Sequence, residues 1–116
     1  MPVFKEKDVQ GKEAFPGVTL AVGISADNGS KDATMGKITM KPGSEIPAHT
    51  HPVSDCMVVI QGKGQAYTEE GFVPIEAGCQ LFAPAGSPHG LKNTGNEPLV
   101  IIFTWPGINV PRTLVE

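Results

Sequence analysis

Short runs of apolar and β-branched residues alternate with turn-forming residues along most of the chain. Runs of this kind, bounded by Gly, Pro, Asn and Asp, are typical of β-strands. They recur about every 8–12 residues, which is the spacing of an antiparallel sandwich or barrel. The segments that we expect to form strands are 18–24, 34–40, 57–61, 65–68, 72–75, 80–83 and 99–105.

The last of these segments has its own pattern. Residues 99–103 read Leu-Val-Ile-Ile-Phe, so apolar side chains occupy both faces of the expected strand. Strands of this kind are usually covered on both sides. We therefore expect the segment to lie inside a two-layer barrel or at a contact between subunits.

Composition excludes several other architectures. The 116 residues include 14 Gly and 11 Pro, and the longest stretch free of both is 53–61. A membrane-spanning helix needs about 20 consecutive apolar residues, and a coiled coil needs a sustained helical repeat. We therefore expect an all-β chain with a single domain over residues 1–116, including an N-terminal arm or strand at 1–16 and an extended tail at 106–116.

The charged residues point away from nucleic acid. Nine basic and twelve acidic side chains give a formal net charge of −3, and they are spread along the chain without a Lys or Arg cluster to follow a phosphate backbone. The first residues lack the apolar core of a secretory signal, so we expect a cytoplasmic protein with no membrane partner. The two cysteines, Cys56 and Cys79, are expected to be reduced there.

The three histidines follow a pattern that suits a metal ion. His49 and His51 are separated by one residue, so an extended segment projects both from the same face. Asp55 shares their parity if the intervening proline introduces no bulge, and His89 follows the rigid turn 84–88. If the sheet curls so that this turn faces the His49 strand, three neutral imidazoles converge. Such a set can hold a divalent transition metal and leave coordination positions open, as catalytic sites do.

Two motifs around these histidines resemble the signature of the cupin superfamily. The first family motif is Gly, five residues, His-x-His, three or four residues, Glu, six residues, Gly. Residues 43–62 match it with Asp55 in place of the Glu. The second motif is Gly, five residues, Pro-x-Gly, two residues, His, three residues, Asn, and residues 78–93 match it at every specified position. The two motifs and the short spacer 63–77 cover nearly half of the chain.

The resemblance implies a small single-domain cupin with the double-stranded β-helix fold, a jelly-roll-like antiparallel barrel. It also implies that His49, His51 and His89 bind one divalent transition metal ion, and Fe, Ni, Zn, Mn, Cu and Co all suit imidazole ligands. A homodimer is the implied assembly, with an outer strand or the segment 3–15 at the contact. The motif glycines and Asn93 are assigned to turns rather than to chemistry.

Asp55 departs from the family pattern, and its role stays open. Its carboxylate is one methylene shorter than that of Glu, so on an unchanged backbone its oxygens lie about 1.5 Å too far back for a direct bond to the metal. The strand can bulge inward so that Asp55 ligates, Asp55 can hold a water on the metal, or it can serve as a general base or as a partner of a ligating histidine. We favour the last two together and expect Asp55 to be catalytic. A thiolate ligand from Cys56 is disfavoured because its parity directs it away from the histidine face.

The motifs do not identify the reaction, because cupin barrels carry out many different reactions. We expect an enzyme, a dioxygenase or a metal-assisted isomerase or lyase, that acts on a small and weakly charged organic molecule. The charge expectation rests on Arg112, the single arginine, which lies in the tail, whereas pockets for phosphates and dicarboxylates usually contain an arginine. The candidates for the pocket lining are Met40, Met57, Val59, Phe82, Leu91 and Phe103, with Tyr67, Gln80 and Lys92 as candidate polar contacts. Most strand residues of a small barrel pack the core or face solvent, so each candidate is more often a core or surface residue than a substrate contact.

The alternative to an enzyme is a barrel that binds or senses a small ligand without turning it over. Sensor cupins are commonly fused to a DNA-binding or signalling domain, and the 116 residues leave no room for one, so the enzyme is preferred. A purely structural barrel is the third hypothesis.

Overall fold

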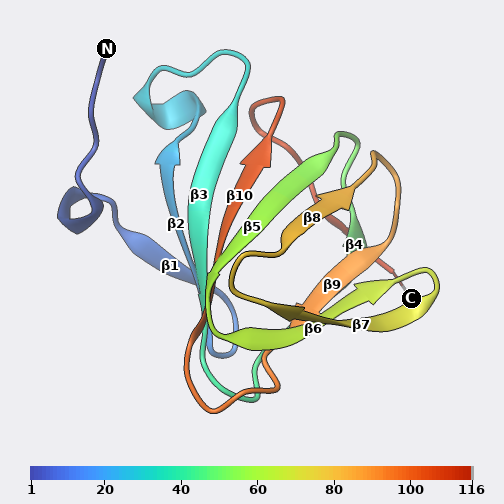
Figure 1. Cartoon of the computed structure of the whole chain (residues 1–116). Helices are drawn as coiled ribbons and strands as arrows, with labels where there is room; N and C mark the ends of the chain where they lie inside the picture. Colours follow the sequence, from blue (N-terminus) through green and yellow to red (C-terminus); the bar gives the residue numbers. More distant parts are fainter. Residues whose placement is uncertain (116) are drawn as a thin grey trace.

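The computed structural model describes residues 1–115 and folds them into two antiparallel sheets that enclose one core (Figure 1). The six-stranded sheet has the order β1 (Gly11–Phe15), β2 (Val18–Ile24), β3 (Thr34–Met40), β10 (Leu99–Trp105), β5 (Asp55–Gln61) and β8 (Gln80–Ala83). The five-stranded sheet has the order β11 (Thr113–Leu114), β4 (Glu45–Thr50), β9 (His89–Lys92), β6 (Lys63–Thr68) and β7 (Gly71–Glu76). Two short 3-10 helices are η1 (Glu6–Asp8) and η2 (Ala26–Asn28). The expectation of an all-β barrel is confirmed.

All seven expected strands are present. Four of them, β2, β3, β8 and β10, have the bounds expected from the sequence, and β5, β6 and β7 are slightly longer than expected. β1 falls within the N-terminal arm or strand expected at 1–16, and β4 was expected only as an extended segment around His49 and His51; β9 and β11 were not expected. The proline in β4, Pro47, explains one omission, because proline within a run argues against a paired strand. Here it lies where the pairing of β4 with β9 is irregular, between Ile46 and His49, and this irregularity accommodates it.

β10 carries much of the core. It lies between β3 and β5, and its inward side chains Leu99, Ile101 and Phe103 are at most 2% exposed. Val100 and Ile102 face the other side of the sheet and are half-buried. Only the inner face of this strand is therefore fully covered within one chain.

The turns of the two motifs have the scaffold roles expected of them. Gly62 has a φ of 85°, and a Cβ there would meet Pro98 O at 2.5 Å, so only glycine fits the turn between β5 and β6. Asn93 is 1% exposed, and its side-chain amide donates to Met40 O and Glu97 O, both at 2.9 Å. Its Oδ1 accepts from the backbone N–H of Gly95. These bonds hold the turn that follows β9.

The two ends of the chain lie on different sides of the barrel. The N-terminal arm stands beside β1, and the C-terminal tail runs back along β4 (Figure 1). The tail pairs through Thr113 opposite Thr50 and Leu114 opposite His49. Glu116, the last residue of the expected tail, lies outside the described residues. Within residues 1–115, no helix has the length and apolar character needed to cross a membrane.

Candidate metal centre

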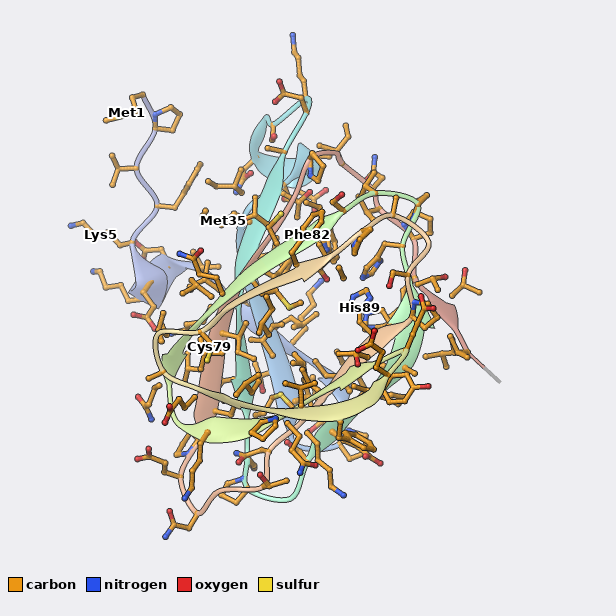
Figure 2. The ribbon with its side chains drawn as sticks, turned by 45° about the vertical axis from the view of Figure 1, so that its right-hand side comes forward. Met1, Lys5, Met35, Cys79, Phe82 and His89 are labelled. Carbon is orange, nitrogen blue, oxygen red and sulfur yellow. The ribbon has the colours of Figure 1, made fainter. Side chains whose placement is uncertain are left out.

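The three imidazoles meet inside the barrel. His49 on β4 lies directly opposite His89 on β9, and their ring centroids are 4.3 Å apart. His51 follows the end of β4, with its ring centroid 4.8 Å from that of His49 and 5.4 Å from that of His89. His89 points into the barrel interior (Figure 2). A hydrogen bond of 2.8 Å from the N–H of Gly86 to His51 O ties the second motif to the first.

Asp55 joins the imidazoles from the other sheet. It is the first residue of β5 and pairs with Ala83, just before the turn that carries His89. Its Oδ2 lies 3.1 Å from His89 Nε2 and 3.6 Å from His51 Nε2. One potential ligand atom from each of His49, His51, Asp55 and His89 lies within 4.8 Å of the others. The structure therefore brings together all four residues that were singled out from the sequence, and the shorter carboxylate is not set back from the imidazoles.

Backbone carbonyls hold each imidazole by its outer nitrogen. Nδ1 of His49 is 2.8 Å from Pro47 O, Nδ1 of His51 is 2.9 Å from Pro111 O, and Nδ1 of His89 is 2.9 Å from Ser87 O. Since a carbonyl only accepts, Nδ1 carries the proton in all three rings. The neutral rings therefore present unprotonated Nε2 atoms, which is how bound metals are usually ligated.

Burial and the nearby carboxylate act differently on the histidines. Burial lowers the pKa of His49 to about 4, against the opposing effect of its bond to Pro47 O; the neighbouring histidines and the positive charge of Arg112 lower it further. Burial also acts to lower the pKa of His89, but its hydrogen bonds to Asp55 and Ser87 O and the Asp55 charge outweigh that effect and raise it. The cluster thus keeps His49 neutral and attracts positive charge to the space between His89 and Asp55.

The donor set fits a divalent transition metal. With neutral imidazoles, His89 Nε2 and Asp55 Oδ2 are two acceptors 3.1 Å apart, which need a proton or a cation between them. The second oxygen, Asp55 Oδ1, is buried and has no hydrogen-bond donor among the described residues. A buried carboxylate oxygen without a partner is costly. Three imidazoles and one carboxylate are ligands that Zn, Fe, Mn, Ni, Cu and Co all accept.

A cavity of about 50 Å³ adjoins the cluster. Of the expected lining residues, Met57, Leu91 and Phe103 line it. Met40 and Val59 are in the closed core instead. The other candidates lie outside the cavity: Phe82 and Gln80 line a groove on the outside of the six-stranded sheet, Tyr67 packs edge-on against Phe72, and Lys92 is exposed. The other apolar lining residues are Leu20, Ile38 and Ile46.

Besides these three, two lining residues with polar groups were missed in the sequence. Trp105 lines the cavity, with its ring centroid 4.8 Å from that of His51. Its parity with Phe103 along β10 was a usable signal, because alternate residues of a strand share a face. Arg112 also lines the cavity, since the tail crosses to His51 through Pro111. The expectation that the arginine is remote from the pocket is therefore wrong, and no local pattern could have shown it.

The cysteines stand apart from the cluster. Cys56 is exposed and lines the outer groove, so the thiolate alternative is wrong. Cys79 is a free thiol packed against the core.

An antiparallel barrel that gathers three imidazoles and a carboxylate around its interior defines the class to which this protein belongs. The cupin domain family matches residues 36–105, and the chain belongs to that family. Its fold is the cupin double-stranded β-helix. The polyketide cyclase RemF from Streptomyces resistomycificus superposes with a TM-score of 0.87 at 20% identity, over 100% of this chain and 86% of that one.

The proteins that are similar in sequence include the following two. Auxin-binding protein 1 of Arabidopsis thaliana is 32% identical over 82% of this chain and 54% of that protein. The tetracenomycin polyketide synthase protein TcmJ of Streptomyces glaucescens is 30% identical over 75% of this chain and 59% of that protein. The chain thus spans between half and three fifths of the length of these relatives.

Proposed function

We propose that the protein is a metal-dependent enzyme that acts on a small organic molecule held beside His49, His51 and His89. The observation that carries this proposal is the convergence of four ligand-type side chains from three segments of the chain. All four are at most 9% exposed, and among residues 1–115 the buried Oδ1 atom of Asp55 has no hydrogen-bond donor. When bound, a divalent transition metal supplies Lewis-acid or redox chemistry at coordination positions that the protein leaves open. The reaction classes that suit this site are dioxygenation and metal-assisted isomerisation or lyase chemistry.

The distances favour a direct role for Asp55 in holding the metal. Atoms that bind one ion at about 2.1 Å stand roughly 3.0–3.4 Å from one another. The separations of Asp55 Oδ2 from Nε2 of His89 and His51, 3.1 and 3.6 Å, are close to that spacing. This differs from the role that we favoured from side-chain length alone. Asp55 Oδ1 remains available to accept a proton from a bound ligand, which is the catalytic role we assign to it.

Elemental analysis tests the proposal. Protein purified without added metal and without affinity histidines is compared with His49→Ala and His89→Ala. We expect about one equivalent of transition metal in the parent and its loss in both variants, because each removes a ligand. Glu76→Gln is the control and should retain the metal, because it removes an exposed carboxylate at the end of β7. Metal-free parent protein that also fails to take up added Zn²⁺, Fe²⁺ or Mn²⁺ contradicts the proposal.

Oxygen consumption then separates the reaction classes. A redox-active metal with oxygen uptake on a panel of small organic substrates supports dioxygenation. Turnover without oxygen uptake supports isomerase or lyase chemistry.

A ligand-binding protein is the second candidate, and one observation favours it. The relative at 32% identity is an auxin-binding protein. The same barrel and cluster would then retain a ligand unchanged. Recovery of a tightly bound ligand unaltered after long incubation, together with no turnover on the panel, favours this candidate over the enzyme.

We also propose that the chain forms a homodimer through the outer face of the six-stranded sheet. Met35, Thr104, Cys56 and Phe82 form one row across β3, β10, β5 and β8. Met35 is 41% exposed and Phe82 is 67% exposed, and both line the outer groove (Figure 2). A second copy would cover this row and the half-buried outer side chains of β10. Light scattering should give twice the chain mass for the parent and a monomer for Phe82→Glu; a monomeric parent contradicts the proposal.

A further inference from the structure

Polar groups on the wall of the cavity are divided into two kinds. The cluster side carries acceptors, namely the imidazole Nε2 atoms and Asp55 Oδ1. Trp105 and Arg112 also line the cavity, and the polar groups of their side chains are hydrogen-bond donors only. Acceptors suit a cation, and donors suit an anion. The metal proposed above would bind the acceptors of the cluster. It would leave the donors of Trp105 and Arg112 without a partner.

The indole N–H of Trp105 is a buried donor without an acceptor. Its Nε1 atom has no hydrogen-bond partner within residues 1–115, although the ring packs against His51 and Phe103, with centroids 4.8 Å from each. Buried N–H groups nearly always have a partner in folded proteins. A ligand oxygen in the cavity that Trp105 lines would supply one.

Arg112 is available for a ligand as well. Its guanidinium stacks on Phe15, 4.4 Å from the ring centroid, and no carboxylate of the described chain pairs with it. Stacking leaves the edge of the planar group, which carries the N–H donors, free to bind. The preceding residue, Pro111, accepts the hydrogen bond from His51 Nδ1, so the backbone of the tail is fixed next to the cluster.

Charge favours an anion at this position. Asp55 and Arg112 are the lining residues that carry a charge when the histidines are neutral, and their charges cancel. A divalent ion on the cluster would leave an excess of two positive charges. The remaining wall is apolar, formed by Leu20, Ile38, Ile46 and Leu91 among others, and this strengthens charge pairing.

We propose that Arg112 and the indole N–H of Trp105 form an anion-binding subsite for the carboxylate of a small organic ligand, beside the four-residue cluster. Arg112 binds the carboxylate through its N–H edge, in the planar geometry that arginine and carboxylates share, and Trp105 donates one further hydrogen bond. The cavity of about 50 Å³ limits the part of the ligand that it encloses to a few non-hydrogen atoms. The role of this ligand as substrate rests on the function proposed above, and it replaces the expected weakly charged substrate with an anionic one.

Two unique NMR resonances test this proposal. The chain has one Trp and one Arg, so the indole N–H and the Arg112 side-chain N–H are unambiguous in a spectrum of ¹⁵N-labelled protein. Zinc-loaded protein is titrated with acetate and, separately, with neutral acetamide. We expect acetate to shift both resonances with one common Kd, and acetamide to bind at least tenfold more weakly.

Variants assign the effect to the two donors. Arg112→Gln should weaken acetate binding about 10–100-fold, because it removes a charge-assisted interaction, and Arg112→Lys should lie in between. Trp105→Phe keeps the ring and loses the donor, with an expected loss of about 2–10-fold. Lys92→Gln removes the same charge from an exposed position of β9 and should leave the Kd unchanged.

The outcomes separate this proposal from the metal. Zinc-loaded protein in which acetate moves neither resonance, or in which Arg112→Gln binds acetate as the parent does, overturns the anion subsite and leaves the metal proposal standing. If elemental analysis finds that the protein takes up none of Zn²⁺, Fe²⁺ and Mn²⁺, the proposed function fails. The same acetate titration of that metal-free protein then decides the subsite, with shifts of both resonances supporting it and their absence overturning it.

Discussion

The two sides of the cavity differ in how firmly they are held. On the cluster side, each imidazole is fixed by a backbone carbonyl, and all four polar side chains are buried. On the tail side, Arg112 is exposed and rests on one aromatic ring. A metal needs ligands at set positions, and fixing the imidazoles in advance lowers the entropic cost of binding it. A ligand that must enter and leave is better served by a contact at the edge of the fold.

This comparison predicts unequal effects when each side is altered. Substitutions on the cluster side should change metal affinity strongly. Substitutions on the tail side should leave the metal nearly untouched.

The largest effect is expected for the ligand histidines. His89→Ala should lower the affinity for Co²⁺ by more than about 100-fold, since losing even an outer partner of a ligand typically costs 10–100-fold. Titration of metal-free protein, followed by the visible absorption of bound Co²⁺, measures the affinity. Arg112→Gln is the matched change on the tail side and should alter it by less than about threefold. Equal losses in both variants would refute the division of the cavity.

Asp55 should rank next. Asp55→Asn keeps the size of the side chain but removes its charge, and we expect a loss of Co²⁺ affinity of about 10–100-fold. The same titration measures it, with Glu76→Gln as the control for the loss of one carboxylate. An affinity equal to that of the parent would show that Asp55 is not a ligand. It would favour the roles suggested by its side-chain length, in which Asp55 holds a water on the metal or is a partner of a ligating histidine.

Acid should destabilise the metal-free protein through His49. Between pH 6.5 and about 4, an unfolded His49 binds a proton that the folded one does not, because burial lowers its folded pKa to about 4. The free energy of unfolding should therefore fall as the pH falls through this range, by on the order of 2 kcal/mol after allowing for partial solvation. Urea denaturation at a series of pH values measures it.

His89 acts with the opposite sign, and variants separate the two. Its pKa is raised in the folded protein, chiefly by Asp55 acting against burial, so it stabilises the fold in acid and this contribution is lost as the pH rises through its folded pKa. His49→Gln should flatten the acid limb of the stability curve, and His89→Gln should steepen it. An unchanged limb in His49→Gln contradicts the assignment.

The smallest effect links the two sides. The charge of Arg112 is the smallest of the contributions to the low pKa of His49, so Arg112→Gln should raise that pKa slightly. NMR titration of the His49 ring in metal-free protein measures it. Lys92→Gln, the remote change of charge, should leave it unaltered at moderate salt. A shift of the same size in both variants would place Arg112 no nearer to His49 than a surface lysine.

The two sides also differ in how far the sequence predicts them. The cluster follows from local spacing, because His49, His51, Asp55 and His89 lie in motifs whose strands and turns hold them at set positions. The position of the tail does not follow from local spacing. Its approach to His51 depends on one carbonyl, Pro111 O, and on pairing with β4, a strand that the sequence pattern did not predict because it contains Pro47. Side-chain length alone also gave the wrong position for the Asp55 carboxylate, because its distance from the imidazoles depends on where the backbone of β5 begins.

The central claim is that three Nε2 atoms and one carboxylate oxygen hold a single ion. Anomalous diffraction at the cobalt edge from crystals of Co²⁺-loaded protein tests it most directly. We expect one strong peak in the barrel, about 2.1 Å from Nε2 of His49, His51 and His89 and within bonding distance of Asp55 Oδ2. The absence of an anomalous peak between these four side chains, or a cobalt peak found only on the outer surface of the protein, would contradict the claim.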